Sequence, residues 1–199
     1  METSTEKVIK LLLTFPKRKW KQKELAEAVG CSKAFLSKLT KKLIEKGILA
    51  RPYKNQIILL SFTNALNFWQ TMRKLPKPVY IKTNLNQEEI IKKLEKTPHC
   101  LTLFYAAWLR IKFMKTNTVE VYVLKNEINK FVKIFGKESN EPTNFIVFPA
   151  DKYVFLGSEK INNLRVVSLV QNYVDLMIYG GSGVRVALKL AEKYNLLGV

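Results

Sequence analysis

Apolar side chains recur at helical spacing in three segments near the start of the chain. The spacing predicts helices over residues 5–15, 22–29 and 32–46. It places Lys10 on the polar face of the first helix and Ala28 on the apolar face of the second. In the third helix, Leu36, Leu39 and Leu43 share one face, which we expect to be buried.

Residues that start or stop helices separate these segments. Pro16 ends the first helix because proline lacks the backbone N–H that a helix interior needs. Gly30 stands at the C-cap of the second helix, and Ser32 stands at the N-cap of the third. Gly47 ends the third helix.

Two short apolar segments follow, over residues 48–50 and 56–60, and they flank polar residues 53–55. This pattern predicts a β-hairpin. Three helices followed by a hairpin is the element order of a winged helix-turn-helix, in which the hairpin is the wing. We therefore expect that fold at the start of the chain.

A further helix over residues 63–74 leads to Pro76 and Pro78, where we place a domain boundary. Beyond it, predicted strands cover residues 79–83, 119–124, 145–148, 153–156 and 166–167, a mixed apolar segment covers 101–113, and predicted helices cover 87–96, 127–135, 168–179 and a final stretch after Gly183. The fold class is therefore α+β. It comprises an N-terminal winged helix-turn-helix at residues 1–75 and a mixed α/β domain at residues 76–199.

Two pairs of residues resemble capping boxes in the second domain. Asn86 is followed three positions later by Glu89, and Ser168 is followed by Gln171. Such pairs satisfy free backbone donors at the start of a helix, which supports helix starts at these two points.

Basic residues outnumber acidic ones by 34 to 16, and the net charge is +18 at pH 7. The excess is densest in residues 1–75, which hold 16 Lys and Arg against 5 Asp and Glu. Residues 76–199 hold 18 against 11. A surface this basic favours a polyanionic partner, and double-stranded DNA is the partner we expect for a winged helix.

The third predicted helix supplies most of the expected DNA contacts. Its solvent-facing side carries four lysines and no acid before Glu45. The N-terminal half of such a helix enters the major groove, where Lys and Ser bond base edges and apolar groups meet thymine methyls. The expected contacts are Lys33, Ser37 and Lys38 with base edges; Ala34 and Phe35 with thymine methyl groups; Lys41, Lys42, Lys17, Arg18 and Lys19 with phosphates; and Arg51 and Lys54 with the backbone or the minor groove.

One winged helix covers only about half a helical turn of readable groove, so specific binding to an operator usually needs two modules. We expect either a homodimer on DNA or a monomer that binds paired sites. The sequence does not choose between them.

No motif for catalysis, cofactor binding or metal binding is found in the sequence. It has no P-loop, no G-x-S-x-G, and no complete G-x-G-x-x-G, because Val186 stands at the last position of the only candidate. Asp151 and Asp175 lack the paired acid that a two-metal site requires. His99 is the only histidine, and Cys31 and Cys100 are too far apart in sequence to suggest a metal site. We expect no enzyme activity and no cofactor.

The chain has no run of 18 apolar residues that could span a bilayer. Its first ten residues are polar and charged and lack the apolar region of a signal peptide. We therefore expect a cytoplasmic protein that does not associate with a membrane.

A family resemblance appears near the C-terminus. Residues 167–176 read Val-Ser-Leu-Val-Gln-Asn-Tyr-Val-Asp-Leu, and residues 179–185 read Tyr-Gly-Gly-Ser-Gly-Val-Arg. This stretch resembles the AbiE-type antitoxin family, in which a winged helix precedes a mixed domain that ends in such a helix, a Gly-Gly-x-Gly turn and a final helix. The resemblance implies a repressor that binds inverted repeats at its own promoter and opposes a nucleotidyltransferase-like toxin encoded beside it.

Other interpretations stay open at this point. The Asp175 and glycine signature also fits a simple pair of capped helices in which the glycines adopt positive φ. A ligand-responsive regulator would need an apolar pocket, for which Tyr105, Trp108, Phe113 and Phe131 are candidates. The basic N-terminal part could instead dock an enzyme on nucleic acid, or belong to an assembly module whose lysines are merely solvated.

Overall fold

The computed structural model describes residues 2–54 and 56–197 of the chain. Its backbone contacts divide the chain into two compact units, Glu2–Arg73 and Lys74–Val199. Helices and strands occur in both units, which confirms the predicted α+β class. None of the helices in the described residues combines the length and apolar character needed to cross a membrane.

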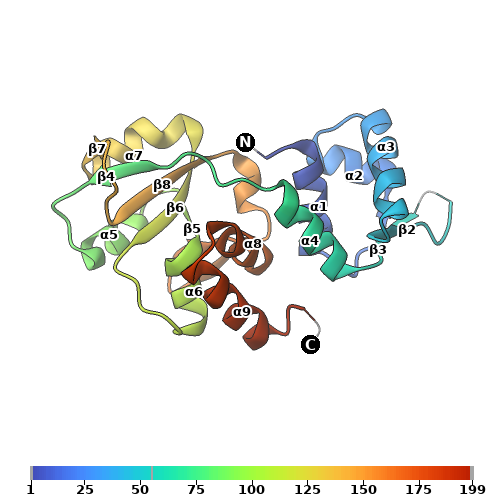
Figure 1. The fold of residues 1–199 in the computed structure, drawn as a ribbon. Helices are drawn as coiled ribbons and strands as arrows, with labels where there is room; N and C mark the ends of the chain where they lie inside the picture. The colour runs from blue at the N-terminus through green and yellow to red at the C-terminus, as the bar shows by residue number, and fades with distance from the viewer. Residues whose placement is uncertain (1, 55, 198–199) are drawn as a thin grey trace. The chain divides into compact units, whose positions relative to one another are not determined.

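Among its described residues, the first unit contains four helices and three short strands; Figure 1 shows their arrangement. In chain order these are α1 (Ser4–Thr14), β1 (Trp20–Lys21), α2 (Gln22–Val29), α3 (Lys33–Glu45), β2 (Leu49–Ala50), β3 (Gln56–Leu59) and α4 (Phe62–Met72). The strands form an antiparallel sheet with β3 in the middle, where Trp20 pairs with Ile57 and Leu49 pairs with Leu59. The hairpin lies where the sequence predicts it, although residue 55 of its turn lies outside the described residues. The short strand β1 was not predicted from the sequence.

The core of this unit is built from one apolar stripe of each helix. Val8 and Leu12 of α1, Leu25 of α2, Leu36 of α3 and Trp69 of α4 are all buried. The helical periodicity of the sequence therefore identifies the inner faces correctly for most positions.

Two positions in these helices contradict the sequence pattern. Lys10 was placed outside, but its side chain is 0% exposed and its Nζ lies 3.5 Å from the carboxylate of Glu2. Arg73 contacts the same carboxylate at 3.2 Å, so opposite charges compensate the burial. Ala28 was placed inside, but it is exposed, and Ala26 takes the buried position beside Leu25.

The second unit is a mixed sheet with helices on both faces. Its elements are β4 (Val79–Lys82), α5 (Gln87–Leu94), β5 (Cys100–Leu101), α6 (Leu103–Ile111), β6 (Val119–Leu124), η1 (Lys125–Glu127), α7 (Ile128–Phe135), β7 (Lys137–Ser139), β8 (Phe145–Ala150), η2 (Lys152–Phe155), β9 (Glu159–Ile161), β10 (Leu164–Val166), α8 (Leu169–Tyr179) and α9 (Ser182–Tyr194). The strand order is β7-β4-β8-β6-β5-β10-β9. The pairs β6–β8 and β5–β10 are parallel, and the others are antiparallel.

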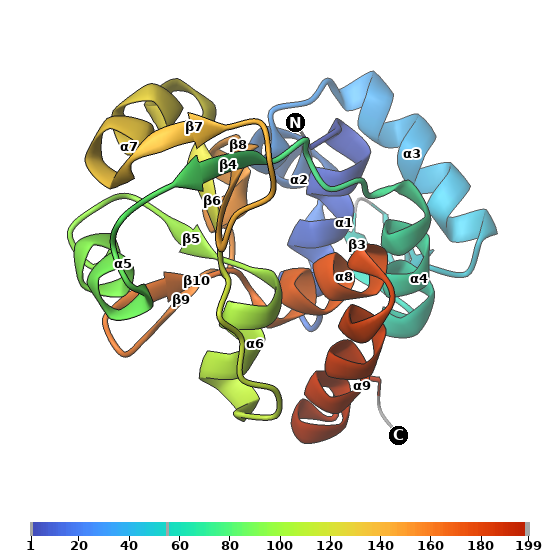
Figure 2. The ribbon, with the colours of Figure 1, turned by 60° about the vertical axis from the view of Figure 1, so that its left-hand side comes forward.

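Side chains of the central strand β6 take part in the packing on both faces of the sheet. Val119, Val121 and Val123 share a core with Phe131 and Phe135 of α7, together with residues of α5. Side chains alternate along a strand, so Tyr122 points to the opposite face, where its hydroxyl meets α8. In Figure 2, α5 and α7 lie to the left of the sheet and α8 and α9 to its right.

Several elements of this unit differ from the sequence prediction. Residues 153–156 were predicted as a strand, but 153–155 belong to the 3-10 helix η2 and Leu156 is its C-cap. The Asp151 side chain accepts a hydrogen bond from Tyr153 N at 2.9 Å and closes the turn that starts η2. The short strands β5, β7 and β9 were not predicted. The capping box of Asn86 and Glu89 is confirmed in both directions. At Ser168 only half of the box forms, because the Gln171 side chain donates to Asp175 instead.

Helices α8 and α9 pack closely where the chain turns between them. A Cβ atom built on Gly183 would lie 2.5 Å from the carbonyl oxygen of Leu176, which is far inside contact distance. The glycine is therefore required for the approach of the two helices.

We expect Gly183→Ala to destabilise the second unit by about 1–3 kcal/mol, because the backbone of α8 must move away. Leu188→Ala, which removes a half-exposed side chain from α9, the helix that also holds Gly183, is the matched control and should change stability much less. Denaturant unfolding of the full chain measures both, and equal midpoints would contradict the close packing.

Strand β6 carries a buried carboxylate, Glu120, which lies beside the start of α6. Glu120 of β6 is 2% exposed and accepts hydrogen bonds from Tyr105 N at 3.0 Å and from the Thr118 hydroxyl. Burial raises the pKa of Glu120 from 4.5 to about 7, although these hydrogen bonds act in the opposite direction. The folded chain therefore holds a proton on Glu120 at pH values where the unfolded chain has lost it.

The buried carboxyl of Glu120 makes the stability of the folded chain depend on pH. Stability from this group is complete below pH 4.5 and is lost as the pH rises to about 7, a change of up to about 3 kcal/mol. Glu120→Gln, which is neutral throughout, should flatten this part of the stability profile. Denaturant unfolding between pH 5 and 8 measures it, and parallel profiles for the two proteins would show that Glu120 does not titrate in this range.

Candidate nucleic-acid interface

Helix α3 is held by one face and exposed on the other. Leu36, Leu39 and Leu43 are buried, and the Thr40 hydroxyl turns back to the Leu36 carbonyl oxygen at 2.7 Å. The positions opposite the leucines are exposed. The outward direction of α3 is therefore determined by its leucines.

The turn before α3 sets the angle between α2 and α3. Gly30 adopts left-handed backbone angles, φ 67° and ψ 42°, and Cys31 N donates to the carbonyl oxygen of Ala26 at 3.0 Å. Ser32 then caps α3 by accepting a hydrogen bond from Phe35 N at 3.1 Å. Both caps predicted from the sequence are confirmed, and together they make a turn short enough for α2 to brace α3.

All of the expected DNA-contacting residues are exposed. They are Lys33, Ala34, Phe35, Ser37, Lys38, Lys41 and Lys42 on α3, Arg51 and Lys54 in the loop between β2 and β3, and Lys17, Arg18 and Lys19 in the segment before β1. Within α3, Ala34, Lys38 and Lys41 follow the i, i+4, i+7 spacing of a single line opposite the leucines. Lys42 lies beside this line. The line ends at Glu45, whose negative charge would repel phosphates.

Two hollows follow one another along the exposed face of α3. One of about 570 Å³ lies between the starts of α2 and α3 and is lined by Lys21, Gln22, Lys23, Lys33, Ala34 and Ser37. The other, of about 470 Å³, joins α3 to the loop after β2 and is lined by Ser37, Lys38, Lys41, Ile44, Glu45 and Arg51. Ser37 borders both hollows. The exposed ridge of α3 thus has one hollow along its N-terminal half and one along its C-terminal half, and basic side chains line both.

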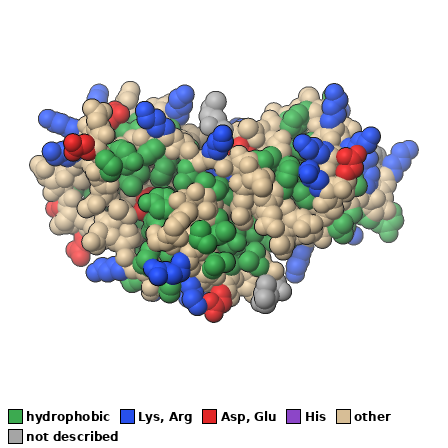
Figure 3. All heavy atoms as spheres, viewed as in Figure 1, with side chains coloured by type: hydrophobic (Ala, Val, Ile, Leu, Met, Phe, Trp, Pro, Cys, Tyr) green, Lys and Arg blue, Asp and Glu red, His purple; other side chains and the backbone are tan. Residues whose placement is uncertain are grey.

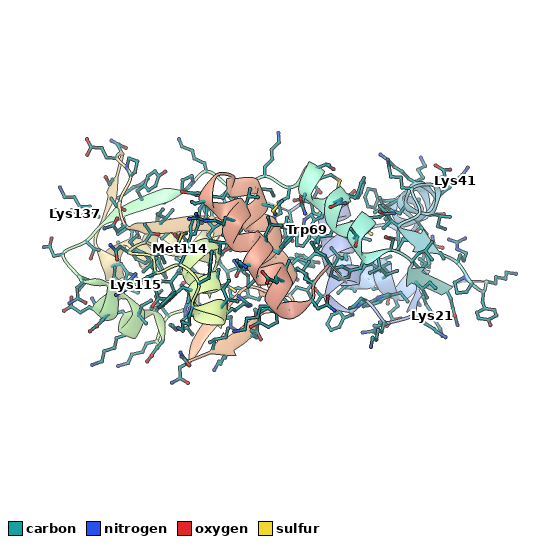
Figure 4. All side chains as sticks on the ribbon, turned by 60° about the horizontal axis from the view of Figure 1, so that its bottom comes forward. Lys21, Lys41, Trp69, Met114, Lys115 and Lys137 are labelled. Carbon is teal, nitrogen blue, oxygen red and sulfur yellow. The ribbon has the colours of Figure 1, made fainter. Side chains whose placement is uncertain are left out.

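The first hollow adds residues that sequence reasoning missed. Lys21, Gln22 and Lys23 at the start of α2 lie beside Lys33 of α3. Lys23 is exposed, but the periodicity of α2 alone does not show which neighbour its exposed face adjoins. Figure 4 shows Lys21 and Lys41 extending outward from this unit, and Figure 3 shows basic side chains gathered at its α3 end.

Arg18 differs from its two lysine neighbours. It forms an ion pair with Glu24, and its guanidinium lies 3.9 Å from the centre of the Trp20 ring. This arrangement holds Arg18 in place and uses Glu24, one of the few acids near the surface. Lys17 and Lys19 are exposed. A contact from this segment to a phosphate therefore falls mainly to the lysines.

The four residues considered for a ligand pocket occupy different environments. Phe131 lies in the core of the second unit, stacked on Phe135 with ring centres 4.5 Å apart. Tyr105 packs partly against that core, whereas Phe113 is 42% exposed in the loop after α6. Trp108 is half-buried and lies under the ammonium of Lys112 at 4.8 Å. Nothing in this arrangement favours a ligand-responsive regulator.

The C-terminal signature residues point into the second unit. Asp175 is 0% exposed and accepts hydrogen bonds from the hydroxyls of Thr102 and Tyr122, each at 2.9 Å. Asn172 accepts from Arg110 at 3.1 Å and donates to the Leu103 carbonyl oxygen at 3.0 Å. These side chains connect α8 to β6 and to the start of α6, so their first role is structural.

His99 is also held by the fold. Its Nδ1 lies 2.8 Å from the Thr97 carbonyl oxygen, and its Nε2 accepts a hydrogen bond from Arg165 N at 3.2 Å. Burial lowers the pKa of His99, which keeps the ring neutral. Among the described residues, no three His, Cys, Asp or Glu side chains lie close enough together to hold a metal ion.

No model of a known protein family matches the chain, and no curated protein sequence matches it. Function must therefore be inferred from the residues and their arrangement.

Proposed function

We propose that the chain is a sequence-specific regulator of transcription that binds double-stranded DNA, and that its Glu2–Arg73 unit is a winged helix-turn-helix. The observation that best supports this proposal is the surface of α3. Its line of Ala34, Lys38 and Lys41 stands opposite the buried leucines and borders two hollows that further basic side chains line. A helical ridge whose exposed face and adjoining hollows carry cations suits a major groove bordered by phosphates.

The roles of individual residues follow from their positions. Ala34 and Lys38 stand on the outer line in the N-terminal half of α3, where the helix enters the groove and meets base edges. Lys42 lies to the side of this line, so it contacts a phosphate. Lys21 and Lys23 border the hollow beside Lys33 and contact the phosphates on that side.

The operator is bound by two copies of the chain, because one α3 covers only about half a helical turn of groove. The two copies form a homodimer on DNA or occupy paired sites as monomers. As a DNA-binding regulator, the protein acts in the cytoplasm. No cofactor and no catalytic step enter this function.

We further propose that the regulator is antitoxin-like and represses its own promoter. The resemblance of residues 167–185 to the AbiE-type antitoxin family supports this part, and it implies a nucleotidyltransferase-like toxin as a partner. Because Asp175 and Asn172 are buried, a toxin must contact other residues of the second unit. Co-purification with the product of an adjoining nucleotidyltransferase-like gene tests this part, and the lack of any such gene would favour a standalone regulator.

The affinity for duplex DNA should fall steeply with salt. We expect a log–log slope of roughly −4 to −8, which corresponds to about 5 to 8 neutralised phosphates. Fluorescence anisotropy with a labelled duplex between 50 and about 300 mM salt measures this slope.

Two triple variants, one at α3 and one control in the second unit, test which lysines set this slope. The combination Lys38→Ala, Lys41→Ala, Lys42→Ala should make the slope less steep by about 2, because Lys41 and Lys42 contact phosphates whereas Lys38 contacts base edges. The combination Lys130→Ala, Lys133→Ala, Lys137→Ala removes the same charge from exposed positions of the second unit and should leave the slope nearly unchanged. A slope near zero for the parent chain would contradict DNA binding by this surface.

Lys38 and Lys42 should differ in what their loss changes. Lys38→Ala should reduce the preference for the selected operator over random duplexes by about 1–3 kcal/mol, because a base contact is lost. Lys42→Ala should weaken operator and random DNA by the same factor, because a phosphate contact carries no sequence information. Competition assays on both DNAs measure the two effects, and identical profiles for the two variants would overturn these assignments.

A further inference from the structure

The loop between β2 and β3 exposes an aromatic side chain that the fold does not use. Tyr53 is 68% exposed, more than any other large apolar or aromatic residue among those the structure describes. No aromatic ring pairs with it in the described part of the chain. The exposed ring of Tyr53 therefore adds little to the stability of the unit.

The backbone nevertheless holds Tyr53 in a defined place. Gln56 N donates to the Tyr53 carbonyl oxygen at 3.1 Å, which closes a turn at the start of β3. Pro52, directly before Tyr53, has a fixed φ and keeps Arg51 extended. Figure 1 shows the loop projecting beyond α3 and the sheet of its unit.

The charges around Tyr53 indicate what it meets. Arg51 and Lys54 flank it, and Arg51 also lines the hollow that borders α3. The loop is therefore continuous with the proposed DNA-binding surface. An aromatic ring between two cations suits a duplex, because the cations contact the two phosphate strands while the ring faces the groove between them.

We propose that Tyr53 is the non-ionic contact of the wing, and that its ring packs against deoxyribose in the minor groove next to the major groove occupied by α3. This inference rests on the proposed DNA binding. In this arrangement Arg51 and Lys54 supply attraction that depends on salt, and Tyr53 supplies attraction that does not. Its hydroxyl can add a hydrogen bond to the acceptors of A·T pairs, but the ring is the main contact.

The experiment separates the ring from the charges. Tyr53→Ala should weaken duplex binding about five- to tenfold at every salt concentration, with an unchanged log–log slope, because the lost contact is apolar. Tyr53→Phe should stay within about twofold of the parent because it keeps the ring. Lys54→Ala should instead make the slope less steep by about 1.

Two further measurements locate the contact. Hydroxyl-radical cleavage attacks deoxyribose from the minor groove, so Tyr53→Ala should lose protection in one short stretch while the protection due to α3 remains. Tyr194→Ala, which removes an exposed tyrosine from the second unit, is the matched control and should bind like the parent. Unfolding midpoints should be equal for all these variants, because the altered side chains are exposed.

The outcomes distinguish this inference from the proposed function. If the parent binds duplexes with a steep salt dependence while Tyr53→Ala binds equally well and leaves the same footprint, the role of Tyr53 is wrong and DNA binding stands. A changed slope for Tyr53→Ala also overturns the non-ionic contact. If the parent shows no salt-dependent binding, the proposed function fails and the inference fails with it.

Discussion

The burial of three leucines decides which side of α3 faces solvent, and the proposed function depends on that orientation. Leu36, Leu39 and Leu43 are at most 7% exposed. Burying each contributes about 1.5–3 kcal/mol, whereas repulsion between lysines one turn apart costs only about 0.2–0.5 kcal/mol per pair. The apolar term is larger by an order of magnitude, so the helix can carry a line of like charges on its outer face without losing its place.

The turn between α2 and α3 and the ion pairs of α2 also shape this surface. Gly30 and Ser32 make the turn that holds α3 beside α2, and this brings Lys33 next to Lys21 and Lys23. Arg18 pairs with Glu24, and Lys23 lies 3.9 Å from Glu27, so two acids of α2 are partly neutralised within the unit. The unit thus presents mainly positive charge around the ridge.

The sequence predicts elements with long, regular patterns well and misses features that depend on distant residues. The three N-terminal helices, the caps at Gly30 and Ser32 and the hairpin are predicted, because each is specified within about fifteen residues. The capping box of Thr3 and Glu6 that starts α1 was missed. The burial of Lys10 was not predictable, since its environment includes Glu2 and Arg73, which lie 71 positions apart. The strand β9 was missed as well, although its turn, Asn162 and Asn163 with φ of 50° and 64°, is a recognisable hairpin signal.

In the candidate site too, locally specified positions are predicted, and positions that depend on the packing of separate elements are not. The exposed positions of α3 are predicted from periodicity, whereas Lys21 and Gln22 become part of the surface only when the angle between α2 and α3 is known. The residues of the C-terminal signature show the opposite case. Their pattern suggested a functional motif, and the structure gives Asp175 and Asn172 buried partners from β6 and α6.

The central claim is that DNA binds at α3, and the most direct test is the reactivity of individual lysines. Acetylation of the full chain with and without a duplex, followed by mass spectrometry, compares Lys33, Lys38 and Lys41 with Lys137 of the second unit. Lys41 and Lys137 are both labelled in Figure 4. The duplex should protect the three lysines of α3 and leave Lys137 as reactive as before. Protection confined to the second unit, or equal protection everywhere, would contradict a DNA-binding role for α3.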